Sequence, residues 1–276
     1  MLSKINSCPG LNLSFIEIIV FLIDDIMGLK PWFRLLTQIL ITIYMIFATD
    51  IYLISLGDLF GLGIINLGIL SIPITVFCVV GVMNAFNMID GINGLCAGCA
   101  MLSLLFIGFY SGFIYDSMLI LIIGSMMGFL IFNMRFFGLR RGVFLGDSGS
   151  NLIGFWVAWI AIYCSQNQLY QVNPITMIWF VAIPLLDCIG LIFSRVKRRI
   201  SISSPGRDHI HHRLMAKFSS EGTLGIILVL STLTGLIGIH ANNSYPSWVS
   251  TLLFVMYAST YYLINTFYTK TMVKSK

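Results

Sequence analysis

Residues 117–134 read Ser-Met-Leu-Ile-Leu-Ile-Ile-Gly-Ser-Met-Met-Gly-Phe-Leu-Ile-Phe-Asn-Met and are followed at once by Arg135. The run contains no charged side chain, and as an α-helix it is about 27 Å long at ~1.5 Å per residue. The hydrocarbon core of a bilayer is about 30 Å thick, so this stretch predicts a helix that crosses a membrane.

The composition extends this prediction to the whole chain. Hydrophobic residues make up 58% of the 276 residues, and charged residues make up only 10%. A soluble domain carries about 25% charged residues, so this chain lacks the polar surface that a soluble fold needs. We therefore predict an all-α, polytopic transmembrane helical bundle, a single domain over residues 1–276, with about nine spans of ~20 residues.

Other apolar runs mark the remaining expected spans. The expected spans are 12–23, 35–56, 62–84, 95–114, 117–134, 150–166, 174–194, 223–241 and 247–268. The first run is only about 16 Å long as a helix, little more than half of a bilayer core. Neither a secretory signal nor a cleavage site precedes it. The cysteines lie mostly inside these runs, where we interpret them as packed small apolar residues, Cys96-Ala-Gly-Cys99 included.

The distribution of basic residues predicts the orientation. If the spans alternate, all but one of the 16 Lys and Arg residues fall on one side of the membrane. The largest group follows the seventh span, within the loop 195–222, and the connections on the opposite side contain none. Because Lys and Arg gather in cytoplasmic loops, we expect this side to be cytoplasmic, with the amino terminus outside and the carboxyl terminus inside.

Most acidic residues near span ends fall on the same expected cytoplasmic side. Asp24-Asp25 ends the first apolar run, directly before a basic turn. Two adjacent carboxylates at a membrane boundary need a cation or a phosphate-bound metal nearby, which makes this pair a candidate metal site. A solvated helix end is the alternative.

The densest polar segment in the first half of the chain is Asn84-Ala-Phe-Asn-Met-Ile-Asp-Gly-Ile-Asn-Gly-Leu95. Its amides, its carboxylate and its glycines at a span junction are typical of a loop whose backbone approaches a ligand. Amide side chains both donate and accept hydrogen bonds, as recognition of a nucleobase or an N-acetyl group requires. A plain interfacial turn is the alternative.

A second polar segment, Val143-Phe-Leu-Gly-Asp-Ser-Gly-Ser-Asn151, joins a basic loop to the following span. Glycine, serine and the amino terminus of the following helix can hold a phosphate, and Asp147 can hold Mg²⁺. The segment lacks the spacing and the lysine of a P-loop, so a Walker-type nucleotide site is not indicated. The alternative is that Asp147 or a serine caps the helix.

Three of the 4 histidines fall within Ser203-Ser-Pro-Gly-Arg-Asp-His-Ile-His-His-Arg213. A His-x-His-His pattern can bind Zn²⁺, but the neighbouring arginines repel a cation. Arg207 and Arg213 flank the histidines, which favours an anionic phosphate as the ligand. Metal binding and a plain basic loop are the alternatives.

Together, these segments place aspartates for Mg²⁺, amides for recognition and a His/Arg cluster for anions on one face of a membrane protein. That combination indicates phosphoryl transfer from a soluble nucleotide to a lipid. A transporter is the hypothesis from another class. It would need charged groups along a midplane path, and only Glu17, Asp50 and Asp187 lie within expected spans.

The same motifs resemble those of the polyprenyl-phosphate N-acetylhexosamine-1-phosphate transferases, which form glycosyltransferase family 4. The resemblance rests on residues 84–95 and 143–150, Pro184-Leu-Leu-Asp187, His209-Ile-His-His212, and Asp24-Asp25 followed by Gln38. The motifs occur in the family's order with similar spacing. His-Ile-His-His and Asn-Met-Ile-Asp-Gly favour the WecA/TagO-like branch over the related muramoyl-pentapeptide (MraY) branch.

The resemblance implies that undecaprenyl phosphate attacks the β-phosphate of a UDP-N-acetylhexosamine, with Mg²⁺ or Mn²⁺ required. A sugar-1-phosphate, expected to be GlcNAc-1-phosphate, passes to the lipid and UMP leaves. The product begins an envelope glycan such as O-antigen, common antigen, capsule or teichoic acid. The resemblance also implies the bacterial inner membrane, an active site facing the cytoplasm and no nucleic-acid partner, and it allows a homodimer.

Residue roles follow from the resemblance position by position. Asp147 resembles the Mg²⁺ ligand, and Asp24 and Asp25 resemble the pair that serves the lipid phosphate and the metal, so these three are the expected catalytic and metal-binding residues. The expected substrate-binding residues are Asn87, Asp90, Asn93, Asn133 and Phe144 on the nucleoside side and Arg207, His209, His211 and His212 in the phosphate and sugar loop.

Two departures from the family's pattern bear on activity. Asn93 stands where a second carboxylate is usual, so the amide keeps the shape and one acceptor but loses the charge. Relatives begin with further spans and a cytoplasmic sugar-nucleotide loop before the Asp-Asp pair, and here only 23 residues precede Asp24. We interpret this as an amino-terminal truncation. The second hypothesis is therefore a weakly active or inactive homologue that binds partners in the same pathway.

Overall fold

The structure is a computed structural model that describes residues 31–138, 142–170, 172–201 and 209–274. Within these ranges every regular element is a helix, and the only strand-like pairing is an isolated bridge between Ser55 and Asn66. The prediction of an all-α fold is confirmed for this part of the chain. The expected span 12–23 lies outside the described residues.

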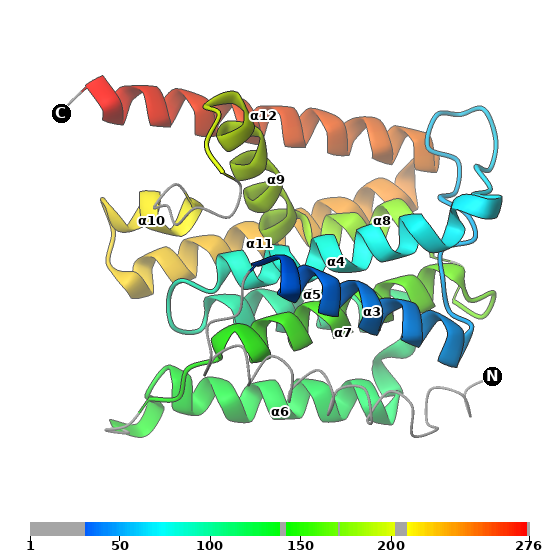
Figure 1. Cartoon of the computed structure of the whole chain (residues 1–276), viewed down its shortest axis with the longest axis horizontal. Coiled ribbons are helices and arrows are strands. Elements are labelled where there is room, and N and C mark those ends of the chain that lie inside the picture. Colours follow the sequence, from blue (N-terminus) through cyan, green and yellow to red (C-terminus); the bar gives the residue numbers. More distant parts are fainter. Residues whose placement is uncertain (1–30, 139–141, 171, 202–208, 275–276) are drawn as a thin grey trace.

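Most helices run along one common direction (Figure 1). The α-helices are α3 (Pro31–Thr49), α4 (Ser71–Ile89), α5 (Leu95–Ser111), α6 (Ser117–Asn133), α7 (Gly146–Gln166), α8 (Pro174–Phe180), α9 (Ala182–Lys197), α10 (Ile210–Met215), α11 (Ser220–Ser244) and α12 (Ser247–Lys274). Short 3₁₀ turns lie at η1 (Gly68–Leu70), η2 (Phe113–Tyr115) and η3 (Phe136–Gly138). In this view α6 and α12 lie at opposite sides, and α9 crosses the common direction.

Four of the described helical segments are long and apolar enough to cross a membrane: α3, η1 together with α4, α11, and Ser247–Thr266 of α12. The α8–α9 pair makes a fifth if it counts as one span, and α5 and α6 are shorter apolar helices. In a bilayer a helix satisfies its own backbone hydrogen bonds, which is why such segments span it as helices. The chain is therefore a multi-pass helical membrane protein.

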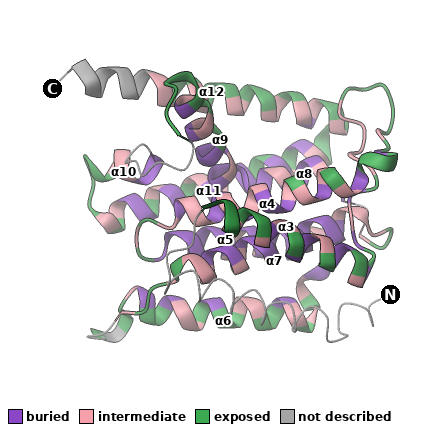
Figure 2. Ribbon diagram, in the orientation of Figure 1, coloured by how far each residue is buried: buried purple, intermediate pink, exposed green. Residues whose placement is uncertain are grey.

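The buried core of the bundle follows α7, which packs against α4 and α5 (Figure 2). Every residue of α7 from Gly154 to Cys164 is buried. α12 is the opposite case, because only 6% of its spanning window is buried inside the protein. A helix that is apolar all round and buried belongs to the interior of the bundle, whereas an apolar and exposed one faces lipid.

Gly154 marks the close approach of α7 to α4. A Cβ atom at this position would lie 2.8 Å from Met83 Cα and 3.3 Å from the Met83 carbonyl oxygen, and backbone atoms cannot turn aside as a side chain does. Overpacking of this kind costs about 1–3 kcal/mol. We therefore expect Gly154→Ala to lower the melting temperature in detergent by several degrees. Gly124→Ala on α6 is the matched control, because its Cβ would meet nothing within 4 Å; equal melting temperatures for the two variants would contradict the close packing.

The expected boundaries of the second and third spans were wrong. α3 ends at Thr49, and the chain between it and η1 is a loop, whereas the expected spans 35–56 and 62–84 left only a short connection. Asp58 builds this loop, since its Oδ1 accepts hydrogen bonds from the backbone N–H of Gly61 at 2.6 Å and of Gly63 at 3.3 Å. Side-chain bonds of this kind stabilise a turn at the expense of a helix.

The expected straight span 174–194 was also wrong, because α8 and α9 meet at a bend of 83°. Pro184, the third residue of α9, has no N–H to donate to the carbonyl of Phe180 four residues earlier. That carbonyl instead accepts a hydrogen bond of 2.8 Å from Ser103 Oγ on α5. The bend is thus stabilised by a neighbouring helix, and it directs α9 across the bundle toward α12 (Figure 1).

Candidate active site

The Asn84–Leu95 segment is helical over its first half. α4 continues to Ile89, so Asn84 and Asn87 are one turn apart on its last turns, and only Asp90 to Gly94 form a loop. We expected a loop throughout, but no glycine or proline lies between Asn84 and Asp90, so the helix continues through the first half of the segment. The helix fixes the direction of the two amides. The turn then closes at Gly94, whose φ of 80° is the left-handed conformation that glycine adopts without strain.

Asp147 is the second residue of α7, and it does not cap the helix. Leu145 occupies the N-cap position and makes no side-chain capping bond. The Asp147 carboxylate instead accepts a hydrogen bond from Asn87 Nδ2 at 3.0 Å and forms an ion pair with Arg34. The same Asn87 nitrogen donates to Ser150 Oγ at 2.9 Å. The ends of α3, α4 and α7 therefore converge on one carboxylate, and the capping alternative does not hold.

Arg34 and Gln38 are site residues for which sequence reasoning assigned no contact. They lie one turn apart on α3 and face Asp147 and Asn151, which have the same spacing on α7. Gln38 Nε2 donates to Asn151 Oδ1 at 2.6 Å, and Gln38 Oε1 accepts from Asn84 Nδ2 at 2.8 Å. A polar pair four residues apart in an apolar helix was the available signal, because such residues share one face.

Asp90 lies beyond the end of α4, close to Asp147. Burial, with a smaller contribution from the negative charge of Asp147, raises the pKa of Asp90 to about 6. Two carboxylates this close together form a site where a cation or a positively charged group is stabilised. The pair came from separate motifs in the sequence, and the structure brings them together.

Asn133, expected in the nucleoside pocket, joins the two polar loops. Its Oδ1 accepts a hydrogen bond of 2.6 Å from the Gly94 N–H, and its Nδ2 donates to the Val143 carbonyl at 2.7 Å. The side chain is buried, so these bonds fix the distance between the loops. Asn93 and Phe144 lie at the surface of the same region, and 76% of Phe144 is exposed.

The histidine motif packs against the Asp90–Gly94 loop. A Cβ on Gly91 would lie only 2.0 Å from His211 Nε2, so the ring occupies the space beside that glycine. His211 is 1% exposed, and its Nδ1 has no hydrogen-bond partner among the described residues. Burial, with a smaller contribution from the neighbouring His212 and His209, lowers the pKa of His211 to about 4. At neutral pH His211 is therefore a neutral hydrogen-bonding group rather than a charge.

The rings of the motif are arranged for contact with each other. The His209 and His211 rings are stacked with centroids 5.4 Å apart, and the His211 and His212 rings are 4.2 Å apart. No group of three His, Cys, Asp or Glu side chains in the described ranges is placed to hold a metal ion. The geometry of this part of the chain thus gives no support to the Zn²⁺ alternative for the histidines. Asp24, Asp25 and Arg207 lie outside the described residues.

The residues at Asp147 fit Mg²⁺ as one protein carboxylate with oxygen ligands around it. Asp147 is part-buried, Asp90 is close, and Ser150 Oγ lies beside Asn87. Mg²⁺ prefers oxygen ligands and is usually held by one or two carboxylates, with water and substrate phosphates completing its shell. A site with one or two protein carboxylates and further oxygen atoms nearby is therefore compatible with Mg²⁺.

Comparison with known proteins identifies a family and several similar enzymes. The sequence profile of "Glycosyl transferase family 4" matches residues 10–165. The chain is 34% identical over 256 residues to the undecaprenyl-phosphate alpha-N-acetylglucosaminyl 1-phosphate transferase of Escherichia coli K12, covering 90% of this chain and 70% of that protein. The protein of the same name from Yersinia pestis is 34% identical over 257 residues, which cover 91% of this chain and 69% of that protein.

Proposed function

The chain belongs to glycosyl transferase family 4, and from that premise we propose that it transfers GlcNAc-1-phosphate from UDP-GlcNAc to undecaprenyl phosphate and releases UMP. The observation that carries the proposal is the convergence of Asp147, Asn87 and Asp90 at the ends of α4 and α7, with His211 packed against the same loop. Carboxylates, amides and histidines at the end of a membrane bundle suit a reaction between a soluble pyrophosphate and a lipid phosphate.

The reaction is an in-line attack by an oxygen of the lipid phosphate on the β-phosphorus of the sugar nucleotide. The bond from that phosphorus to the bridging oxygen breaks, and the bridging oxygen leaves with UMP. A phosphate monoester has a second pKa near ~6, so the attacking oxygen needs little help from a base. Positioning and charge stabilisation therefore account for most of the catalysis.

Mg²⁺ would be held at Asp147, with Asp24 and Asp25 as further proposed ligands, and when bound it supplies positive charge that offsets the charge of the pyrophosphate. Arg34 is positioned to do the same from α3, since its guanidinium already contacts Asp147. Asn87 fixes the carboxylate through its hydrogen bond of 3.0 Å. These side chains come from three helices, so the site depends on how α3, α4 and α7 pack.

Recognition of the nucleotide and sugar is assigned to the two polar loops and the histidine motif. The exposed ring of Phe144 suits stacking on uracil, and Asp90 and Asn93 lie in the adjoining loop. Asn133 acts on the pocket by joining its two loops. Arg207, His209, His211 and His212 are proposed to contact the phosphates and the sugar, with His211 as a neutral donor or acceptor.

The number of spans, the membrane that holds them and their orientation are part of the same proposal. We place about nine spans in the bacterial inner membrane, by counting the α8–α9 pair as one span and adding α5, α6, α7 and the first expected span to the four membrane-length helices. The site then lies at the cytoplasmic face, because the basic loop after α9 lies on that side under the positive-inside rule. A homodimer is compatible with the large exposed apolar surface of α12.

A donor panel tests the function. Membranes containing the protein are incubated with undecaprenyl phosphate, Mg²⁺ and either UDP-GlcNAc or UDP-GalNAc, and the lipid fraction is analysed by mass spectrometry. We expect GlcNAc-pyrophosphoryl-undecaprenol, its loss on EDTA treatment and its return with excess Mg²⁺. The E. coli relative runs in parallel. If that relative turns over and this chain binds donor without product, the chain is the non-catalytic homologue instead.

A further inference from the structure

Asp187 of α9 contacts the histidine motif through both of its carboxylate oxygens. Its Oδ2 lies 2.9 Å from His209 Nδ1, and its Oδ1 accepts a hydrogen bond of 2.9 Å from the Ile210 N–H. The hydroxyl of Tyr261 on α12 is a more distant third partner, 3.5 Å from Oδ1. Asp187 is only 6% exposed, so these bonds form away from bulk water, where hydrogen bonds to an ionised group are strong.

The bend between α8 and α9 brings Asp187 close to His209. On a straight span Asp187 would lie inside the helix about two turns from its end, which is where the sequence alone placed it. The 83° bend instead directs α9 toward the carboxyl-terminal half of the chain, so that its carboxylate meets His209. The pairing is thus a product of the fold and not of closeness in sequence.

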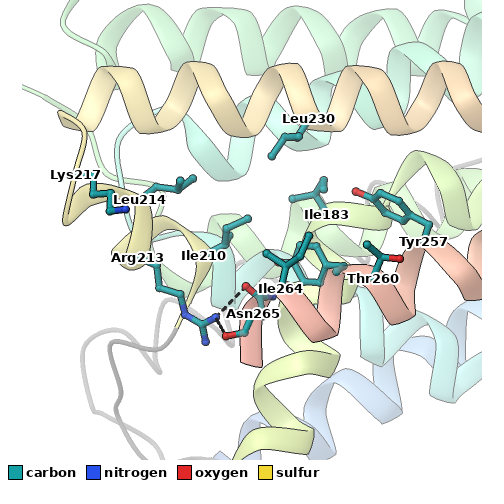
Figure 3. A pocket seen from close by; sticks show the side chains of 11 residues that line it. Ile183, Ile210, Arg213, Leu214, Lys217, Leu230, Tyr257, Thr260, Ile264 and Asn265 are labelled. Carbon is teal, nitrogen blue, oxygen red and sulfur yellow. Dashed lines mark hydrogen bonds between the residues drawn. The ribbon is translucent and has the colours of Figure 1, made fainter. Parts of the chain in front are cut away.

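The helix that carries the histidines depends on such contacts for its position. α10 has only 6 residues, and a helix this short is not stable by itself in water. A cleft of about 320 Å³ lies between α10 and helices α11 and α12, lined by Ile210, Leu214 and Leu230 among others (Figure 3). Apolar packing is therefore incomplete on this side, and polar contacts hold the helix.

Those polar contacts attach α10 at both ends. Asp187 holds its first residues, and Arg213 donates from Nη1 to Asn265 of α12, at 2.9 Å to Oδ1 and 3.1 Å to the carbonyl oxygen (Figure 3). The rings between these attachments include His211, which lies against Gly91 of the Asp90–Gly94 loop, called the substrate loop below because Asp90 and Asn93 are proposed to bind substrate. The position of α10 therefore sets where the histidines meet the site.

We propose that Asp187 is a positioning residue of the transferase, which fixes the tautomer and orientation of His209 and so of the whole histidine motif. An ionised carboxylate only accepts hydrogen bonds, so His209 Nδ1 carries the proton and Nε2 is the nitrogen left for the substrate. Partners of this kind, one step removed from the ligand, typically account for about 10–100-fold in activity. Only the kinetic test of this inference rests on the proposed function; the test of the His209 tautomer does not.

The first experiment needs no change at Asp187. The protein is labelled with ¹⁵N-histidine, and the ring nitrogens of its 4 histidines are observed by NMR, with His209→Asn identifying the His209 signals. We expect His209 to be protonated at Nδ1 at neutral pH. An Nε2-protonated neutral ring, with Nδ1 unprotonated, would overturn the proposal. This outcome does not depend on turnover, so it is distinct from failure of the proposed function, which shows as no product from the wild-type protein.

The second experiment separates positioning from folding. Asp187→Asn keeps the size of the side chain and removes its charge. We expect kcat to fall about 10–100-fold, with the KM for UDP-GlcNAc unchanged and the His209 NMR signals altered. Asp187→Glu keeps the charge and is expected to recover part of kcat. Wild-type kcat for Asp187→Asn, or lost activity with unchanged His209 signals, would contradict the proposal.

Discussion

Replacement of Asp147 by asparagine is expected to abolish turnover, with a loss of at least ~10³-fold in kcat, the size seen when a key electrostatic group of an active site is removed. The amide keeps the shape and one acceptor for Asn87, whose hydrogen bond to the carboxylate is 3.0 Å long. It loses the charge that pairs with Arg34 and that is proposed to hold Mg²⁺. The measurement is UMP release from UDP-GlcNAc at saturating undecaprenyl phosphate and a series of Mg²⁺ concentrations.

The control for this substitution is Asp116→Asn. Asp116 caps α6 by accepting from the N–H groups of Met118 and Leu119, and an asparagine oxygen can accept the same bonds. This variant also removes one negative charge, but at the opposite end of α6 from Asn133. Asp116→Asn should keep wild-type activity, and a wild-type rate for Asp147→Asn would rule out the metal role of Asp147.

Gly91→Ala is expected to reduce activity about 100-fold, although it adds a single methyl group. The new Cβ would lie 2.0 Å from Nε2 of His211, 2.6 Å from Cε1 and 2.7 Å from Cδ2, so the whole ring must move. A displacement of about 1 Å at a substrate-positioning group can cost ~10²-fold in rate. The measurement is kcat/KM for UDP-GlcNAc, and the melting temperature is measured with it to separate displacement of the ring from loss of the folded state.

Gly81→Ala on α4 is the matched control for Gly91→Ala, since a Cβ there would meet nothing within 4 Å. It should keep wild-type kcat/KM. If Gly91→Ala also keeps wild-type kcat/KM, the histidine motif does not lie against the substrate loop in the working enzyme, and the proposed contact between His211 and Gly91 is wrong.

The membrane class and most helices could be predicted from the sequence because they depend on local composition. The run 117–134 is α6 almost to the residue, since an apolar stretch of that length has one stable form in a bilayer. Two of the motifs also meet in the structure: Asn87 and Asp147 are 60 residues apart in sequence and are joined by a hydrogen bond. The residue types indicated the chemistry, whereas the contact between them is known only from the structure.

The bend at Val181 and the contacts of Arg34 could not be predicted in the same way. Pro184 indicates a missing hydrogen bond, but whether the helix bends depends on Ser103 of another helix, which takes the Phe180 carbonyl. Arg34 was explained by the positive-inside rule, which uses its charge and says nothing of its partner. Both features depend on contacts between helices distant in sequence, and no local pattern encodes those contacts.

The contacts of Asn133 could not be predicted from the sequence either. Its position matched a nucleoside pocket, but both ends of the amide bind backbone groups of the two polar loops. A residue-type pattern does not separate a side chain that touches the substrate from one that holds the pocket in shape. The two hydrogen bonds and the burial of Asn133 show that it joins the loops, which is a contact that its residue type did not indicate.

The most direct test of the account uses UDP-GlcNAc labelled with ³²P in the β-phosphate, with undecaprenyl phosphate and Mg²⁺ as the other reactants. In sugar-1-phosphate transfer the β-phosphate moves with the sugar, so the label should appear in the lipid extract while unlabelled UMP forms in the same amount. If the label stays in water as UDP or as unreacted donor, while the E. coli relative labels its lipid in parallel, the proposed reaction of this chain is wrong.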